Sequence, residues 1–488
     1  RRNPFHPSIR SMCRPLAHLA MSLRPVTGWL PASVSARFPR ARVSPPRAPA
    51  PWSSARPSPL PSPSWSSAKV RLEPNPFFGK KRAPYPQHRR SPTPPTLAPK
   101  VPPDPSFPYY IHPHTDVITS DPHNNVTDHI FEKIGYNLHK RPDHPLGIIK
   151  SVIESYFDEK YGQDTFTSYD SLYPVVSTYA NFDSVLVPPD HVSRSQNDTY
   201  YVDEDTVLRC HTSAHQLEML KDGARKFLVT GDVYRRDSID ATHFPVFHQM
   251  EGFRVFEPTE WEEAGKDSVD LAAEELKDCL EGLAKHLFGD VEMRWVDAYF
   301  PFTEPSFELE IFFKGEWLEV LGCGVTEMKI LEEAGLADKR AWAFGLGLER
   351  LAMVLFDIPD IRLFWSDDKR FSKQFKEGMF KAGGVDMQKF KPYSKFPPCL
   401  KDVSFWLPKE GDGFTENNLC EVVRDVAGSL VEEVKLIDEF ENKKKGLTSN
   451  CYRIVYRSME RSLTDDEINS LQERVRDDMV SKLGVELR

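Results

Sequence analysis

The sequence predicts an α+β protein with two folded units preceded by an irregular segment. Candidate strands between residues 227 and 321 follow one another without regular alternation with helices, which favours an antiparallel sheet with helices on one side. A second group of strands and helices begins near Leu400. The chain has 488 residues, enough for about three segments of domain size.

The first 100 residues differ from the rest in composition. They hold 18 Lys and Arg against a single acidic residue, Glu73, and 22 of the 42 prolines. This segment is rich in Arg, Ser and Pro and lacks apolar periodicity, so we expect residues 1–100 to be disordered. The bias is typical of an organelle transit peptide. The alternative is a basic tail that binds nucleic acid.

Residues 101–365 are predicted to form the first folded unit. Apolar spacing predicts helices at 145–161, 213–223, 259–288 and 348–356, with a capping box at Thr259 and Glu262 for the third. Strands are predicted on both sides of a loop at 238–243, and at 292–299, 307–313 and 317–321. Residues 165–187 are aromatic and β-rich, with a break at Pro174. No run of about 18 apolar residues predicts a membrane span.

Residues 366–396 have the composition of a linker, and residues 397–488 are predicted to form the second unit. Its pattern reads strand 403–407, helix 415–426, strand 431–440, strand 451–457, helix 464–483 and strand 485–487. That βαββαβ order is the split ferredoxin-like motif. Both helices carry their own apolar stripe, so we expect this unit to fold alone.

The segment from Phe227 to Phe256 has unusual strand chemistry. If side chains alternate with period two, Arg235 and Asp237 share one face of the first strand, and Phe247, Gln249 and Glu251 share one face of the second. Charges among apolar side chains are costly unless a ligand or partner pairs them. The planar fork of Arg suits phosphate, a Phe can stack on a base, and Glu can hold an ammonium group. The hairpin therefore indicates a site for a nucleotide and an amino compound.

Five regions of the chain carry a family resemblance, and one of them contains both motif 2 and the segment FHQMEG. Arg-x-Asp, a loop and His-x-x-x-Phe-x-x-x-Glu resemble motif 2 of the class II aminoacyl-tRNA synthetases, and GLGLERLAM at 345–353 resembles motif 3. Segments on the substrate side resemble phenylalanyl-tRNA synthetases, above all their single-chain organellar form, from about residue 109 to 488: RCHTSAHQ at 209–216, FHQMEG at 247–252, YFPFTEP at 299–305 and WLEVLGCG at 317–324. The family fold is an antiparallel sheet flanked by helices with a ferredoxin-like anticodon-binding domain appended.

For ATP, the resemblance implies that Arg235 holds the α-phosphate and Arg350 the γ-phosphate, as the two catalytic residues. Phe247 would stack on adenine, and Asp237, where the family most often has Glu, would contact the adenine edge. The remaining implied ATP contacts are Thr242, His243, Phe244 and Glu319. Glu319 is also the implied ligand of Mg²⁺, which would bridge the ATP phosphates with few protein ligands.

For phenylalanine, the resemblance implies that Gln249 and Glu251 hold the ammonium group with His211 and Ser213 nearby. The ring would meet Phe300 and Phe302 edge to face, above a floor of small residues, Thr303 and Ala343. Further implied contacts are Ala214, His215, Gln216, Met250 and Phe344. The alternatives for these residues are ordinary ones: a core Phe pair, a structural histidine and a structural ion pair.

The resemblance implies attachment of phenylalanine to its tRNA through a phenylalanyl-adenylate. The expected partners are ATP, phenylalanine and tRNA, with no membrane, and the expected state is a monomer. The transit-like segment indicates the mitochondrial matrix, with the plastid as the alternative. Two other functions stay open: a class II ligase for a different amino acid, and a catalytically inactive relative that binds RNA. The paired phenylalanines disfavour a polar substrate, and Arg235, Glu251 and Arg350 are all present.

Overall fold

The computed structural model describes residues 121–488 apart from 381–382, 384–388, 393–395, 409–413 and 445. The expected transit segment lies outside the described residues. None of the helices in the described part combines the length and apolarity that crossing a bilayer requires.

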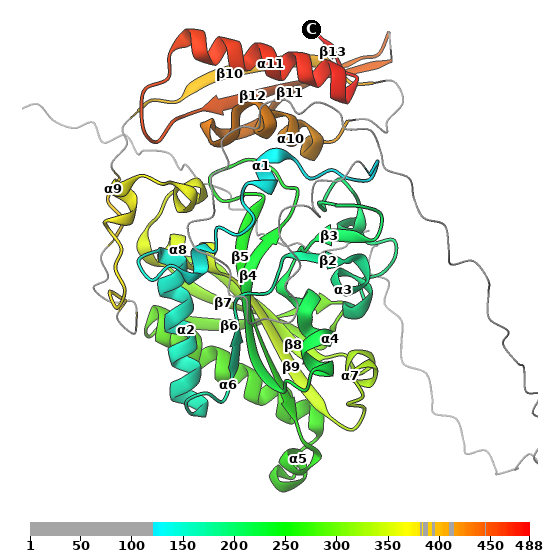
Figure 1. Ribbon diagram of the computed structural model, residues 1–488, viewed down its shortest axis with the longest axis vertical. Helices are drawn as coiled ribbons and strands as arrows, with labels where there is room; N and C mark the ends of the chain where they lie inside the picture. The colour runs from blue at the N-terminus through cyan, green and yellow to red at the C-terminus, as the bar shows by residue number, and fades with distance from the viewer. Residues whose placement is uncertain (1–120, 381–382, 384–388, 393–395, 409–413, 445) are drawn as a thin grey trace, which may run out of the picture. The chain divides into compact units, whose positions relative to one another are not determined.

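A seven-stranded sheet forms the centre of the first unit (Figure 1). The strand order is β1-β4-β5-β9-β8-β7-β6, and every neighbouring pair is antiparallel except β1 with β4. This confirms the predicted antiparallel sheet. The strands are β1 (Thr167–Tyr169), β4 (Lys226–Tyr234), β5 (Val246–Phe256), β6 (Glu292–Phe300), β7 (Thr303–Phe313), β8 (Glu316–Thr326) and β9 (Arg340–Gly347). A separate pair is formed by β2 (Val175–Ser177) and β3 (Thr206–Leu208).

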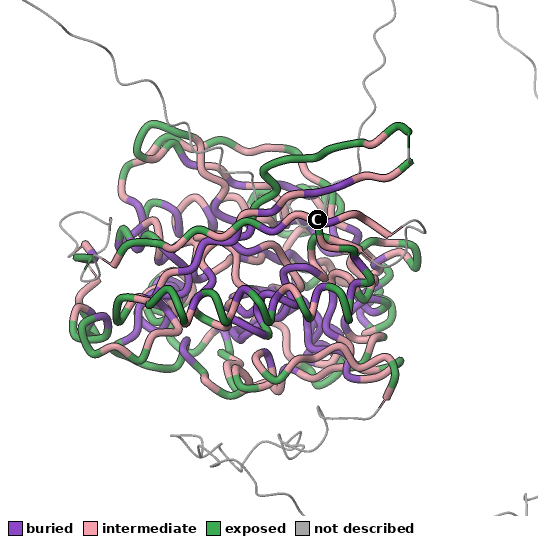
Figure 2. The backbone as a smooth tube through the Cα atoms, turned by 90° about the horizontal axis from the view of Figure 1, so that it is seen from above, coloured by how far each residue is buried: buried purple, intermediate pink, exposed green. Residues whose placement is uncertain are grey.

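Three helices pack against one face of this sheet through the largest apolar core. They are α2 (Pro145–Tyr161), α6 (Ser268–Phe288) and α8 (Leu348–Phe356), and two of them begin and end where the sequence predicts. The remaining short helices of this unit are α1 (Asp128–Phe131), η1 (Leu138–Lys140), α3 (Thr178–Asn181), η2 (Asp183–Val185), η3 (Val192–Arg194), η4 (Thr212–His215), α4 (Gln216–Lys221), α5 (Pro258–Ala264), α7 (Met328–Glu333), η5 (Ile361–Trp365) and α9 (Lys369–Ser372). The tube view shows the buried residues gathered inside, with exposed residues along loops and outer helix turns (Figure 2).

The structure corrects the prediction of one helix over 259–288. Two helices, α5 and α6, stand there, because Gly265 takes a left-handed conformation (φ +63°) and ends α5. Asp267 then caps α6 by accepting a hydrogen bond from Val269 N. The capping box belongs to Glu257 and Glu260, not to Thr259 and Glu262.

Two further differences concern the site. Strand β9 was not predicted. It is mostly buried on both faces, so its small and apolar residues do not alternate with polar ones, and the signal that marks a half-buried strand is missing. Strand β4 ends at Tyr234, so the β4–β5 loop runs from 235 to 245 rather than from 238 to 243. Arg235 and Asp237 therefore belong to this loop and not to one face of a strand.

The C-terminal unit confirms the predicted βαββαβ order. Its strand order is β11-β12-β10-β13, and Tyr452, Ile454 and Tyr456, which alternate along β12, belong to its apolar core. The elements are β10 (Cys399–Trp406), α10 (Glu416–Ala427), η6 (Gly428–Leu430), β11 (Val431–Asn442), β12 (Leu447–Tyr456), α11 (Asp465–Leu483) and β13 (Glu486–Leu487). Ile239 of the β4–β5 loop is buried in the same apolar cluster.

Close packing between β5 and β9 yields a testable consequence. A Cβ on Gly252 would lie 2.1 Å from Cε1 of Phe344, a ring that is 2% exposed and cannot move aside. We expect Gly252→Ala to destabilise the protein by about 1–3 kcal/mol, because overpacking forces strain into a dense core. Thermal unfolding measures the change. Gly345→Ala on the paired strand is the control, since its Cβ would meet nothing within 4 Å; equal stability of the two variants would contradict the packing argument.

Candidate active site

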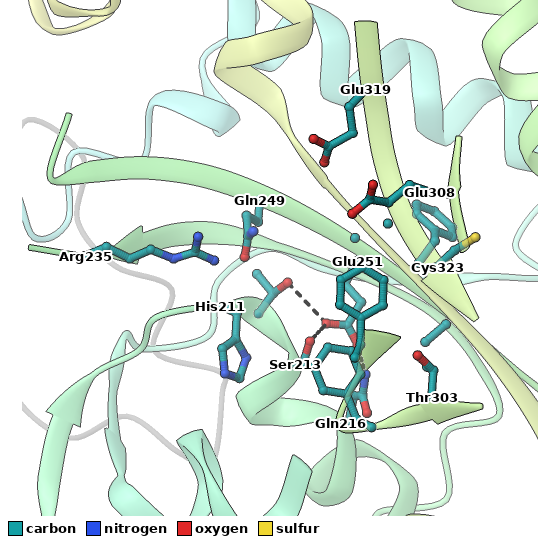
Figure 3. A pocket seen from close by; sticks show the side chains of 17 residues that line it. His211, Ser213, Gln216, Arg235, Gln249, Glu251, Thr303, Glu308, Glu319 and Cys323 are labelled. Carbon is teal, nitrogen blue, oxygen red and sulfur yellow. Dashed lines mark hydrogen bonds between the residues drawn. The ribbon is translucent and has the colours of Figure 1, made fainter. Parts of the chain in front are cut away.

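A pocket lies on the face of the sheet opposite α2, α6 and α8, between the sheet and η4 (Figure 3). Period-two alternation on β5 directs Gln249 and Glu251 into the pocket and Met250 into the core. Twelve of the residues that the sequence singled out line this pocket: His211, Ser213, Gln216, Arg235, Gln249, Glu251, Phe300, Phe302, Thr303, Glu319, Ala343 and Phe344.

Glu251 is the most deeply desolvated acid of the pocket, at 2% exposure. Its carboxylate accepts hydrogen bonds from Ser213 Oγ at 2.5 Å, Gln216 Nε2 at 2.5 Å and Thr212 Oγ1 at 3.4 Å (Figure 3). Burial raises the pKa of Glu251 to about 7, against the lowering effect of these donors. The described side chains around the carboxylate include no cation within ion-pair distance. A ligand ammonium group would supply the missing charge.

His211 and Arg235 form the polar end of the pocket. His211 Nε2 donates to the carbonyl of Asn181 at 2.9 Å, and burial lowers the pKa of His211 to about 3, so the ring is neutral. Its buried Nδ1 has no hydrogen-bond partner among the described atoms. Arg235 Nε donates to the carbonyl of Cys210 at 2.9 Å, and its guanidinium lies 5.1 Å from the centroid of the Phe247 ring. The remaining guanidinium nitrogens can take an anion.

The apolar wall is built by Phe300 and Phe302. Their rings stack with centroids 5.9 Å apart and an interplanar angle of 14°. Gly322 is required opposite them, because a Cβ there would lie 2.7 Å from Cζ of Phe300. Thr303 and Ala343 are buried beside the wall and add little volume, which leaves room for a ring. The wall and floor suit an aromatic or large apolar side chain.

Two carboxylates, Glu308 and Glu319, line the same pocket on neighbouring strands β7 and β8. Burial raises the pKa of each, and the charge of Glu310 raises both further. No group of three or more His, Cys, Asp or Glu that could hold a metal ion exists within the described residues. Any cation here would therefore take most of its ligands from a substrate or from water.

The residues expected around ATP are distributed over the β4–β5 loop, β5 and α8. Arg350 Nε donates to the carbonyl of Glu319 at 2.8 Å, which joins α8 to β8. Phe244 stacks on Trp365 with centroids 5.6 Å apart. Asp237 accepts a hydrogen bond from Ser238 N at 2.7 Å, and Thr242 and His243 both contact Asp240. Of the expected ATP contacts, only Arg235 and Glu319 line the pocket that holds Glu251. The others lie outside it: Asp237, Thr242, His243, Phe244, Phe247 and Arg350.

A buried clamp links the two motifs that carry these residues. Both oxygens of the Glu349 carboxylate bind His248, accepting from its backbone N at 2.8 Å and from its Nδ1 at 2.7 Å. Glu349 precedes Arg350, and His248 stands between Phe247 and Gln249. The clamp therefore fixes the distance between β5 and the first turn of α8.

Three of the residues expected at the amino-acid site lie elsewhere. Met250 is fully buried in the core behind the sheet. His215 accepts from Arg209 Nη1 at 2.9 Å, and Arg209 also pairs with Asp232 at 2.9 Å in a buried network; Ala214 is buried on η4. Sequence reasoning missed Thr212, Glu308, Cys323 and Gly345 as lining residues. Glu308 could not have been singled out, because Glu308 and Glu310 both take the polar positions of an alternating run from Phe307 to Ile311.

Comparisons with known proteins agree with this geometry. The family model "tRNA synthetases class II core domain (F)" matches residues 136–375, and "Ferredoxin-fold anticodon binding domain" matches residues 394–488. The chain is 68% identical to a phenylalanine–tRNA ligase, chloroplastic/mitochondrial, of Arabidopsis thaliana, over 76% of this chain and 85% of that protein. The chain belongs to the phenylalanine–tRNA ligase family.

More distant members of the family align over similar shares of the chain. The mitochondrial phenylalanine–tRNA ligase of Mus musculus is 49% identical over 75% of this chain and 86% of that protein. The mitochondrial enzyme of Saccharomyces cerevisiae is 39% identical over 77% of this chain and 95% of its own length. Both alignments cover most of the relative, so they include the catalytic core and the C-terminal unit.

The buried Glu251 carboxylate predicts how stability depends on pH. The pKa of Glu251 is raised to about 7 in the folded protein, so between the ordinary Glu pKa and pH 7 the folded protein keeps a proton that the unfolded chain has lost. The free energy of unfolding therefore falls as pH rises through this range. Glu251→Gln should therefore stabilise the ligand-free protein by about 1–3 kcal/mol above that pH. Thermal unfolding near pH 6 and pH 8 measures the difference, which should grow with pH.

The control for this experiment is Glu263→Gln, an exposed position on α5. It should leave the pH dependence of stability unchanged. A Glu251→Gln protein that melts below the wild type at alkaline pH would show that the carboxylate is stabilising and would contradict the desolvation argument.

Proposed function

We infer that this protein is an organellar phenylalanine–tRNA ligase that uses ATP to attach phenylalanine to tRNA. The observation that carries this conclusion is one pocket with two ends: a desolvated carboxylate, Glu251, and a wall of stacked rings, Phe300 and Phe302. That combination fits the ammonium group and the aromatic ring of one amino acid. The reaction itself is inferred from the membership of this chain in the phenylalanine–tRNA ligase family.

The reaction has two steps. A carboxylate oxygen of phenylalanine attacks the α-phosphorus of ATP, the bond to the β-phosphate oxygen breaks, and pyrophosphate leaves. A ribose hydroxyl at the 3′ end of tRNA then attacks the acyl carbon, gives up its proton, and AMP leaves. Neither step needs a covalent bond to the protein, so positioning and charge stabilisation supply most of the rate.

Phenylalanine recognition is assigned to residues that face the pocket. Glu251 and Gln249 receive the ammonium group, and the three donors to Glu251 keep the carboxylate oriented before the ligand arrives. His211 is neutral and adds hydrogen bonding without repelling the ammonium group. The ring enters between the Phe300–Phe302 wall and the floor made by Thr303 and Ala343. Ser213, Gln216 and Phe344 line the remainder.

ATP recognition is assigned to the β4–β5 loop and α8. Arg235 receives the α-phosphate, and its position over Phe247 places it next to the ring on which adenine would stack. Arg350 and His243 receive the γ-phosphate. Asp237, Thr242 and Phe244 are proposed as further contacts of the same loop with the nucleotide.

Magnesium is proposed to assist through Glu319, with Glu308 as its neighbour. The donor chemistry fits, because both are carboxylates on the pocket surface whose pKa values are raised by burial and by nearby like charge. A divalent cation would relieve that repulsion. When bound, it would neutralise charge on the ATP phosphates. Glu319 would also remain tied to Arg350 through its backbone carbonyl.

We propose a separate role for each segment of the chain. Residues 1–100 direct import, 101–365 perform catalysis, 366–396 connect, and 397–488 bind the anticodon region of tRNA. The protein is proposed to act as a monomer in the mitochondrial matrix, with the plastid as the alternative. The organellar names of the relatives support this location.

The proposed function is tested by amino-acid-dependent exchange of pyrophosphate into ATP, measured with all twenty amino acids. We expect phenylalanine to give the highest rate and tRNA to accept phenylalanine from the same preparation. Highest exchange with a different amino acid would identify another class II ligase. No exchange with any amino acid, together with tRNA binding, would identify an inactive RNA-binding relative.

Arg235→Ala should lower exchange by at least about 100-fold, because it removes a preorganised charge that acts mainly in the transition state. Arg235→Lys should recover only part of the rate, since an ammonium group lacks the bidentate fork. Arg461→Ala, an exposed ion-pair variant of the C-terminal unit, is the control and should exchange normally. Near-normal exchange by folded Arg235→Ala would exclude Arg235 from the phosphate site.

A further inference from the structure

The carboxylate of Asp240 organises the β4–β5 loop from within. Its Oδ1 accepts three hydrogen bonds, from Thr242 N at 2.7 Å, Thr242 Oγ1 at 2.8 Å and His243 N at 2.9 Å. Its Oδ2 lies 2.6 Å from Nδ1 of His243. One oxygen therefore shapes the backbone turn, while the other is committed to the imidazole. This division leaves Nε2 as the nitrogen of His243 that can reach a ligand.

The backbone on both sides of Asp240 is also held. The carbonyl of Ile239 accepts from Val434 N at 3.0 Å, and the carbonyl of Ala241 accepts from Ile361 N at 2.8 Å. Ile239 is itself 6% exposed among apolar side chains. Asp240 therefore lies between two residues whose backbone carbonyls are bonded to other elements of the protein.

The charges around His243 come from several elements. Asp240 and Asp237 of its own loop favour the protonated ring, and Arg350 of α8 opposes it. The hydrogen bond that His243 donates to Asp240 is the largest influence and raises the pKa of His243. At the start of η5, the capping residue Asp360 and Arg362 pair with each other at 2.7 Å. On α10, Arg424 donates to the carbonyl of Ser238 at 2.9 Å and pairs with Glu421.

We propose that Asp240 is a positioning residue that holds His243 as an imidazolium, with its Nε2–H directed to a phosphate oxygen of ATP. The proposal rests on the ATP contact assigned to His243 under the proposed function and adds the group that maintains its charge. A doubly protonated ring gives a charge-assisted bond to phosphate, which is stronger than the bond from a neutral ring. The charge contributes to ATP affinity below the pKa of His243 and is lost as pH rises through it.

Asp240→Asn separates the two tasks of the carboxylate. The carboxamide oxygen can still accept the three bonds now made to Oδ1, so the turn is kept. The carboxamide nitrogen then faces Nδ1 of His243 and can only donate to it, which favours the neutral ring with its proton on Nε2. Asp240→Ala removes both tasks and shows what loss of the turn itself does.

The first measurement is the titration of His243 by NMR of histidine-labelled full-length protein, with the signal assigned through His243→Gln. We expect the midpoint to fall by about one pH unit or more in Asp240→Asn, because an adjacent opposite charge has been removed. Thermal unfolding of each variant confirms that it is folded. An unchanged midpoint in folded Asp240→Asn would overturn the proposal.

The second measurement is the affinity for magnesium–ATP between about pH 6 and pH 8, on either side of the ordinary histidine pKa. Asp240→Asn should bind within about twofold of the wild type at the acidic end and about fivefold or more weaker at the alkaline end. Asp240→Ala should bind more weakly at every pH. In a His243→Gln background, Asp240→Asn should cause no further pH-dependent loss.

The matched control is Asp190→Asn, which removes a carboxylate whose charge acts on a different histidine, His191. It should leave ATP affinity unchanged at every pH. Two results together would exclude a contact between His243 and phosphate. In Asp240→Asn, the His243 midpoint would fall while ATP affinity kept the wild-type dependence on pH. In His243→Gln, ATP affinity would equal that of the wild type. The coupling between Asp240 and His243 is judged separately, by the midpoint alone.

Discussion

The alternation of side chains along β5 is the constraint on which the rest of the site depends. One strand, paired on both sides, delivers Gln249 and Glu251 to a polar pocket and His248 and Met250 to the opposite face. A slip of one residue in the pairing would exchange the two sets. The bidentate clamp from Glu349 to His248 holds this register against α8, so the same pair of bonds that secures the core also fixes the spacing between β5 and the first turn of α8.

The polar groups of the pocket lower the stability of the folded protein but suit it to bind a ligand. Among the residues that the structure describes, Glu251 has three neutral donors and no cation within ion-pair distance, and Nδ1 of His211 has no hydrogen-bond partner. Both groups are less favourable in the empty protein than an apolar replacement would be. Their cost is offset by a dense apolar core behind the sheet, where α2, α6 and α8 cover the other face. The core and the site therefore occupy opposite faces of the same strands.

The sequence could predict those parts of the protein that follow local rules. Helix α2 has an apolar stripe that starts at a proline, and α8 begins directly after two glycines, Gly345 and Gly347, so their limits could be read directly. The break between α5 and α6 was hidden because the apolar spacing continues past Gly265. Strand β9 was hidden because both of its faces are covered. Family motifs identified most of the pocket, yet neither motifs nor periodicity could reveal that Asp240 binds His243, since that bond depends on the path of an irregular loop.

Ile239 has a consequence for how such a protein can change over time. This residue of the β4–β5 loop is buried in the apolar cluster of the C-terminal unit, and Val434 N of that unit donates a hydrogen bond to its carbonyl. The two units therefore do not form a simple modular pair that recombination could separate without cost. A C-terminal unit transplanted from another protein would need a matching recess for the side chain at position 239. We therefore expect substitutions at position 239 and in the apolar cluster around it to occur together.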